Sequence, residues 1–241
     1  MKIKAYRRVL LAALAAGAVF TGLMSLLRMQ QGRGVSAFVA APVTVVVDAG
    51  HGGEDGGATS GSGVRESQIN LEIALRLDDF LTICGLPTTM IRRSDVSIYD
   101  PPANSISEKK VSDLRNRAKL VNQTEGAVLL SIHQNHFSDG RYAGAQVFYA
   151  PTNGSKALAE QIQKVLIDKV DPSNHRQAKP SETVYLMNHI QCPGALIECG
   201  FLSNDAEEKR LQDPGYQKKL TLAIVCGLTE WLEEEAETSE V

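Results

Sequence analysis

The chain has 241 residues, of which 43% are hydrophobic, and its formal net charge is −3 at pH 7. This length and composition favour one sizeable domain built around a single core. The first 36 residues hold six of the 25 bases and none of the 28 acids, so the rest carries a net charge near −9. Because nucleic-acid binders need a basic surface, we exclude nucleic acid as a partner.

Residues Val9 to Leu27 form an uncharged, mostly apolar run with basic residues on both sides. This pattern predicts that residues 1–36 are a signal peptide or a retained membrane anchor. The anchor is favoured because the polar stretch Arg28 to Gly34 separates the run from the cleavage-like sequence Val35-Ser36-Ala37. A buried helix of the domain is the weaker alternative. We therefore expect an extracytoplasmic domain, membrane-anchored or secreted.

The four cysteines of an exported chain could form disulfides. Cys84 and Cys226, however, lie in helical patterns, and Cys192 and Cys199 flank an apparent strand. Seven residues at roughly 3.3 Å each would hold the last two sulfurs too far apart to bond. We expect four free and largely buried thiols.

The domain begins with Val43 to Val47, a β-branched run typical of a strand buried on both faces. A glycine-rich loop follows, up to Arg65. From Ser67 onward, apolar residues recur at three- and four-residue spacing, which predicts a helix that Gly85 caps. The start of the domain is therefore a strand-loop-helix unit.

The same alternation continues along the chain. The patterns predict a strand at 88–92, a helix from about 112, strands at 127–132 and 145–149, a helix at 155–169, short strands at 184–186 and 195–197, and a helix from about 216 to 231. Such alternation predicts an α/β domain, residues 43–232, with a mostly parallel twisted sheet flanked by helices on both faces. Residues 233–241 are expected to be a frayed acidic tail.

Four residues with useful chemistry fall at one edge of this predicted sheet. His51 follows the first strand, His133 and Glu198 each end a later strand, and Glu66 opens the first helix. In an open α/β sheet, ligands bind outside the carboxyl ends of the strands. We therefore expect these four side chains to share a crevice.

Two imidazoles and a carboxylate are a donor set that suits catalytic zinc and leaves a fourth position open. His51, Glu66 and His133 are the predicted ligands. Glu198 is then the predicted base, which accepts a proton from the activated water and passes it to the leaving group. Each residue alone also has a structural explanation, such as Glu66 in the first turn of a helix. Their joint placement favours the site.

Other histidines give alternatives to this set. His136 lies three residues after His133 and is the main rival ligand, whereas His175 and His189 fall in polar segments that face solvent or substrate. The glycine-rich loop lacks the spacings of nucleotide-binding motifs, so a nucleotide site is not favoured.

Four segments resemble motifs of the zinc-dependent N-acetylmuramoyl-L-alanine amidases: Asp48 to Gly53, Glu66, Ser131 to Asn135, and Glu198 to Asn204. The likeness covers about residues 43 to 232. Segment 185–204, the apolar N-terminal run and the compact size are more specifically similar to the germination-specific amidases of spore formers. Ala49, Ser67 and His136 depart from the family pattern, where proline, lysine and a small residue are usual.

This resemblance implies a single zinc and cleavage of the amide between the lactyl group of muramic acid and L-alanine. In the germination-specific branch, the cleavage prepares muramic lactam in the spore cortex, so the forespore wall interface is the expected location. Glycan strands and stem peptides are the implied partners. Because no separate wall-binding domain is visible, an activating protein could also assist.

Two other functions stay open from the sequence. A wall-binding or scaffold protein could use a structural zinc, but such sites normally have four protein ligands, often including cysteine. A cysteine hydrolase could use Cys199, but no basic activator is evident near it in the sequence.

Overall fold

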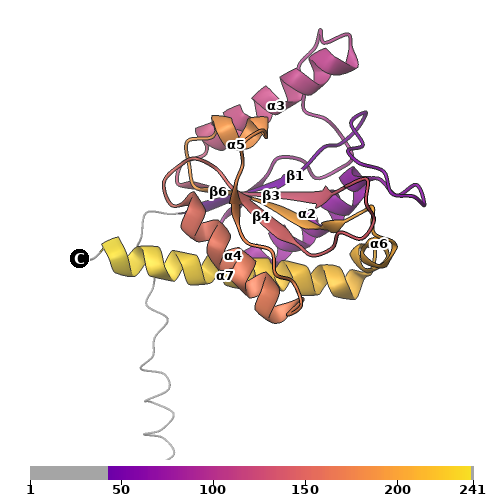
Figure 1. Cartoon of the computed structure of the whole chain (residues 1–241). Coiled ribbons are helices and arrows are strands. Elements are labelled where there is room, and N and C mark those ends of the chain that lie inside the picture. Colours follow the sequence, from indigo (N-terminus) through magenta and orange to yellow (C-terminus); the bar gives the residue numbers. More distant parts are fainter. Residues whose placement is uncertain (1–42, 240–241) are drawn as a thin grey trace, which may run out of the picture. The chain divides into compact units, whose positions relative to one another are not determined.

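The structure, a computed structural model, describes residues 43–239 (Figure 1). The anchor or signal expected at residues 1–36 lies outside these described residues. None of the helices within 43–239 is long and apolar enough to cross a membrane.

One sheet lies at the centre of the described chain. Its strands are β1 (Thr44–Ala49), β2 (Thr88–Met90), β3 (Ala127–Asn135), β4 (Gln146–Tyr149), β5 (Lys179–Pro180) and β6 (Gly194–Phe201), in the spatial order β2-β1-β3-β6-β4-β5. Neighbouring strands are parallel except for β4 and β6, which are antiparallel. The expected mostly parallel sheet is confirmed, with one antiparallel pair that makes it mixed.

Helices cover both faces of this sheet. They are α2 (Glu66–Ile83), α3 (Ile106–Gln123), α4 (Ser155–Lys169), α5 (Tyr185–His189), α6 (Asp205–Leu211) and α7 (Pro214–Ser239). Helices α4 and α7 lie below the sheet in Figure 1, and α3 and α5 lie above it.

Strand β1 shows why the sheet is buried on both sides. Val45 and Val47 pack into the core with α2, α4 and α7, whereas Val46 packs into the second core with α3 and α5. All three are fully buried. Alternate side chains of a strand point to opposite faces, so a continuous β-branched run supplies both cores.

Helix boundaries differ from the prediction in three places. Helix α3 begins at Ile106, about six residues earlier than expected, because Ser105 and Glu108 form a capping box. Helix α6 was not predicted, although the Asn204 side chain caps it. The expected frayed tail is wrong as far as Ser239, because α7 continues as a helix to that residue.

The strand predicted at 184–186 is also wrong. Residues Tyr185 to His189 form the short helix α5, and Leu186 and Met187 bury their side chains in the second core. A short apolar run can bury its side chains as either a strand or a helix, so periodicity alone could not decide.

All four cysteines are free, as expected. Cys199 is buried, but Cys84 and Cys226 are exposed, which corrects the expectation of largely buried thiols. Cys84 lies at the C-terminal cap of α2, and Cys226 faces outward on α7.

Candidate active site

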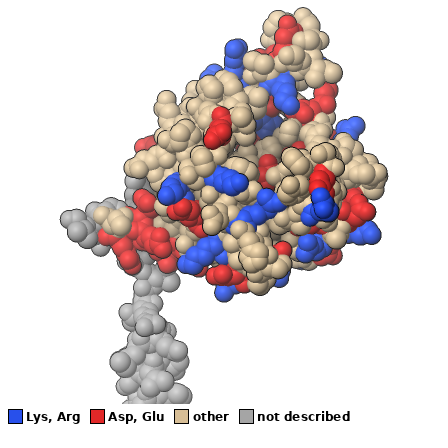
Figure 2. Space-filling view, viewed as in Figure 1, with Lys and Arg blue, Asp and Glu red and all other residues tan. Residues whose placement is uncertain are grey.

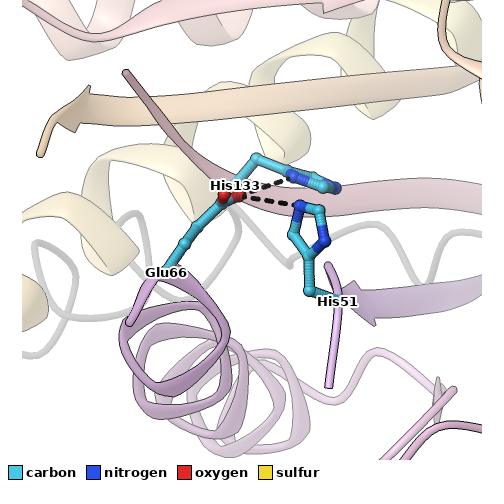
Figure 3. Close-up of side chains that lie close together, drawn as sticks. All are labelled: His51, Glu66 and His133. Atoms are coloured by element: carbon cyan, nitrogen blue, oxygen red, sulfur yellow. Dashed lines mark hydrogen bonds and ion pairs between the residues drawn. The ribbon is translucent and has the colours of Figure 1, made fainter. Parts of the chain in front are cut away.

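Three of the predicted site residues come together at the carboxyl edge of the sheet. His51 follows β1, Glu66 is the first residue of α2, and His133 lies on β3 (Figure 3). Glu66 Oε1 lies 2.9 Å from His133 Nδ1 and 3.3 Å from His51 Nε2. One ligand atom from each residue lies within 4.8 Å of the others, which is a geometry that could hold a metal ion.

Glu66 is a buried carboxylate with several donors around it. Its Oε2 accepts from the Ala58 amide at 2.9 Å, and its Oε1 accepts from the Gln134 amide and from Asn70 Nδ2, both at 3.2 Å. Burial raises the pKa of Glu66, but the hydrogen bonds and charges of the two histidines outweigh it and bring the pKa far below its ordinary value. Glu66 is therefore ionised and ready to bind a cation.

Asp55 orients His51. The Asp55 carboxylate lies 3.0 Å from His51 Nδ1, which leaves Nε2 directed at Glu66. Burial lowers the pKa of His51, but Asp55 and Glu66 outweigh that effect and raise it to about 9. A carboxylate on the far ring nitrogen is the usual support for a metal-binding histidine. Asp55 was not among the predicted site residues, although its spacing of four residues from His51 in the same loop is a usable signal.

Two buried arginines hold the backbone of the His51 loop. Arg92 donates to the carbonyl oxygens of Ala49 and Gly50 at 2.8 and 3.0 Å. Arg117 donates to those of Ala49 and His51 at 3.0 and 2.8 Å. His51 has φ of 61°, in the left-handed region that side-chain-bearing residues rarely adopt. These contacts fix the unusual conformation that directs the imidazole at Glu66.

The charge of Arg117 is balanced inside the protein. Arg117 is 2% exposed and pairs with Asp48 at 2.5 Å and Asp113 at 2.6 Å. Asp48 also accepts from Ser131 Oγ at 2.6 Å. Burial raises the pKa of Asp48, but Arg117, the His133 charge and the Ser131 hydrogen bond together outweigh it and lower the pKa below its ordinary value. This network ties β1, β3 and α3 together directly behind the site.

The glycine-rich loop leaves space for the site. A Cβ atom on Gly50 would lie 2.3 Å from His133 Cε1 and Nε2. A Cβ atom on Gly57, whose φ is +66°, would lie 2.5 Å from Glu66 Oε2 and 2.8 Å from His51 Cδ2. Glycine is therefore required at both positions for the three side chains to meet.

Glu198 lies on β6, directly opposite His133 on β3. Its Oε2 is buried and has no hydrogen-bond partner among the described residues. Burial raises the pKa of Glu198 to about 7, against the opposing effect of the His133 charge. A carboxyl group with this pKa can accept and release a proton near neutral pH.

The rival residues lie elsewhere. His136, His175 and His189 are exposed and outside the cluster, and His189 stacks on the Tyr185 ring. Cys199 packs into the core on the face covered by α2, α4 and α7, where burial raises the pKa of its thiol far above the ordinary value. Neither a third histidine nor a thiolate therefore joins the site.

The surface around the sheet carries mixed charge. Figure 2 shows Lys and Arg side chains interspersed with Asp and Glu over the face in view, with acidic side chains gathered over the C-terminal end of α7. This face offers no continuous basic patch for nucleic acid.

Comparisons with known proteins show similarity to a single enzyme family. The profile of a family described as N-acetylmuramoyl-L-alanine amidase matches residues 45–230. A germination-specific N-acetylmuramoyl-L-alanine amidase of Bacillus subtilis is 37% identical over 199 residues, which cover 81% of this chain and 82% of the relative.

Solved structures give the same likeness. The CwlD amidase of Clostridioides difficile, solved in complex with the GerS lipoprotein, is similar with a TM-score of 0.77 and 37% identity, over 79% of this chain and 98% of that one. An N-acetylmuramoyl-L-alanine amidase from Clostridium difficile 630 has a TM-score of 0.70 and 30% identity, over 80% of this chain and 98% of that one.

Proposed function

The chain belongs to the N-acetylmuramoyl-L-alanine amidase family, and from this premise we propose that it is a zinc enzyme of spore cortex maturation. Amidase activity on peptidoglycan follows from the family. We propose four further points: the zinc, its ligands, the base and the location in the cell. The reaction is hydrolysis of the amide between the lactyl group of muramic acid and L-alanine.

The main observation in support of a zinc site is that ligand atoms of His51, Glu66 and His133 lie within 4.8 Å of one another. Two imidazole nitrogens and one carboxylate oxygen are a donor set that fits zinc and leaves room for a substrate atom. When bound, zinc acts as a Lewis acid that polarises the scissile carbonyl and makes water more acidic. A structural-zinc scaffold is less well supported, because only three such ligands gather among residues 43–239.

Glu198 acts as the general base. Its unpartnered Oε2 accepts a proton from the water that attacks the lactyl carbonyl carbon. The carbon–nitrogen bond then breaks, Glu198 donates that proton to the departing nitrogen, and the products are the free amine of L-alanine and a lactyl carboxylic acid, which loses its proton to solvent. Asp55 and the two buried arginines hold His51 in place throughout.

The cellular role comes from the relatives. Likeness to a germination-specific amidase supports a role in spore cortex, where cleavage prepares muramic acid for lactam formation. The lipoprotein complex of the C. difficile relative supports a protein partner for this chain, and we propose that this partner activates it. Peptidoglycan lies outside the cytoplasmic membrane, so residues 43–232 act there as the catalytic domain, with residues 1–36 as the proposed anchor or signal.

One experiment tests the proposal. The full chain is purified, its zinc content is measured by mass spectrometry, and it is incubated with purified peptidoglycan, whose products are then identified. We expect about one zinc per chain and release of peptides with a free L-alanine amino terminus, which a chelator abolishes. Cleavage of another bond, or full activity in zinc-free protein, would refute it.

A further inference from the structure

A cavity of about 430 Å³ opens beside Glu198. Leu196 and Glu198 of β6 and Phe148 of β4 line it, together with segment 179–184. The cavity lies on the sheet face that α3 and α5 cover, since Leu196 and Phe148 belong to that core. The cavity lies on the β4–β5 side of β6, whereas His133 lies on β3 on the other side of β6, so the cavity extends from the proposed base away from the metal cluster.

Two polar atoms of this cavity have no hydrogen-bond partner within residues 43–239. Ser181 Oγ and Glu198 Oε2 are both buried and without a hydrogen bond among the described residues, and Ser181 is 7% exposed overall. Buried polar groups in proteins are nearly always hydrogen-bonded. Glu198 has a role in the proposed reaction, but Ser181 does not, which points to a polar ligand in the cavity.

The wall that carries Ser181 is held firmly. Lys179 lies opposite Phe148 in the β4–β5 pairing, and the Ser181 amide donates to the Tyr149 carbonyl oxygen at 2.9 Å. A binding group on a paired strand is positioned more precisely than one on a free loop.

Lys179 gives the cavity an unpaired cation. Its side chain is exposed, lines the cavity, and makes no ion pair among the described residues. The cavity also contains the carboxylates of Glu182 and Glu198. In a substrate whose muramic acid lactyl groups are amide-linked, the glycan is neutral, so carboxylates occur only on the peptide. A cation here therefore has its counterpart in the peptide part of the substrate.

We propose that this cavity binds the stem peptide, with Lys179 recognising the carboxylate of the residue after L-alanine and Ser181 hydrogen-bonding to the peptide backbone. This inference rests on the proposed function and adds a preference for an acidic peptide. The peptide then lies on the β4–β5 side of Glu198, where its amine leaves, and the glycan lies on the metal side.

The test compares two muropeptide substrates that differ in one group. One carries a free α-carboxylate on the D-glutamate after L-alanine, and the other carries the carboxamide. We expect the parent to prefer the carboxylate substrate by about tenfold in kcat/KM. Lys179→Gln should remove this preference by raising KM for the carboxylate substrate about tenfold, with kcat and the amidated substrate within about twofold of the parent.

Three further variants sharpen the test. Ser181→Ala should raise KM severalfold for both substrates, because it acts on the shared backbone. Glu182→Gln should lower KM for the carboxylate substrate, opposite in sign to Lys179→Gln. Lys164→Gln makes the same charge change at an exposed position of α4, across the sheet, and should change kcat/KM for neither substrate.

The outcomes separate the two proposals. If the parent releases L-alanyl peptides but Lys179→Gln affects both substrates equally, or no more than Lys164→Gln does, the cavity assignment is wrong and the proposed function stands. If the parent releases no L-alanyl peptide from either substrate or from peptidoglycan, the proposed function fails, and this inference with it.

Discussion

His133 and Glu198 lie opposite each other on the neighbouring parallel strands β3 and β6. The register is continuous from Leu129 to His133, and the irregularity in the pairing comes only after this pair. The separation between a proposed metal ligand and the proposed base is therefore set by backbone hydrogen bonds of the sheet. The position of Glu66, by contrast, depends on where α2 begins, and the position of His51 depends on the loop after β1.

The first prediction concerns Glu198. Glu198→Gln keeps the shape of the side chain but cannot accept a proton at neutral pH, so turnover should fall by at least about a hundredfold while zinc content and folding persist. Zinc analysis and product release measure both effects. Cys199→Ala is the control, since its thiol is buried in the core and held protonated. Near-parent turnover in Glu198→Gln would exclude it as the base.

The second prediction concerns the metal ligands. Alanine at His51, Glu66 or His133 should each abolish hydrolysis and reduce bound zinc together, because each removes one of three ligands. His136→Ala should change neither, since His136 is exposed and outside the cluster. Retention of full zinc by His133→Ala, with loss by His136→Ala, would show that the wrong histidine was chosen.

The third prediction uses the close approach at Gly50. In Gly50→Ala the new methyl group would overlap the His133 ring, whose nearest atoms lie at 2.3 Å, so the imidazole must move. Zinc affinity should therefore fall, and activity with it. Gly61→Ala is a matched control in the same loop, because no atom lies within 4 Å of its added Cβ. Equal zinc affinity in the two variants would contradict this account.

The fourth prediction concerns Arg117. Arg117→Met leaves the buried Asp48 carboxylate without its cation and should lower the free energy of unfolding by about 3–5 kcal/mol. Urea denaturation of the metal-free protein measures this loss. Arg141→Met, which removes an exposed partner of Asp139, should leave the denaturation midpoint unchanged.

The contribution of the Arg117–Asp48 ion pair to stability should depend on pH. Arg117 lowers the folded-state pKa of Asp48, so the pair contributes its full stability above the unfolded pKa of about 4. That contribution should be lost as the pH falls below about 4. In Arg117→Met, this part of the acid destabilisation should be absent.

The fifth prediction concerns protons released by metal binding. The pKa of His51 is about 9 in the metal-free protein, and a histidine must be neutral to coordinate a metal. Zinc binding at pH 7.5 should therefore release about one proton, and the apparent affinity should rise about tenfold per pH unit up to about pH 9. Calorimetry in buffers of different ionisation enthalpy counts the proton. Asp55→Asn should reduce the release, because it removes a group that raises this pKa.

The main parts of the site could be predicted because they depend on topology. His51, His133 and Glu198 come at or near the ends of strands that the sequence marks by short apolar runs, and the carboxyl ends of parallel strands share an edge. Asp55 could not be placed in this way, because it lies in a loop whose path depends on several positive-φ glycines. Ser181 and Lys179 are placed at the cavity by the pairing of β5 with β4. Strand β5 has only two residues, so it has no periodicity that the sequence could show.

Errors in the fold have similar causes. Val184 and Leu186 are apolar enough for a strand, and only the tertiary packing shows that this segment is helical. The spacing of Ser105 and Glu108 is the sequence signature of a capping box at the start of α3. The polar residues around them made this signature look like part of a loop. The antiparallel direction of β4 depends on how segment 136–145 returns to the sheet, which no local pattern specifies.

The backbone conformation of His51 has an evolutionary consequence. At φ of 61°, a residue with a Cβ atom has a backbone conformation about 1 kcal/mol less favourable than the same conformation in glycine. Mutation toward glycine at this position would relieve the backbone strain but remove the imidazole that pairs with Asp55 and Glu66. The strain is therefore retained together with a side chain of the proposed metal site, which is the pattern expected where a backbone conformation serves function as well as folding.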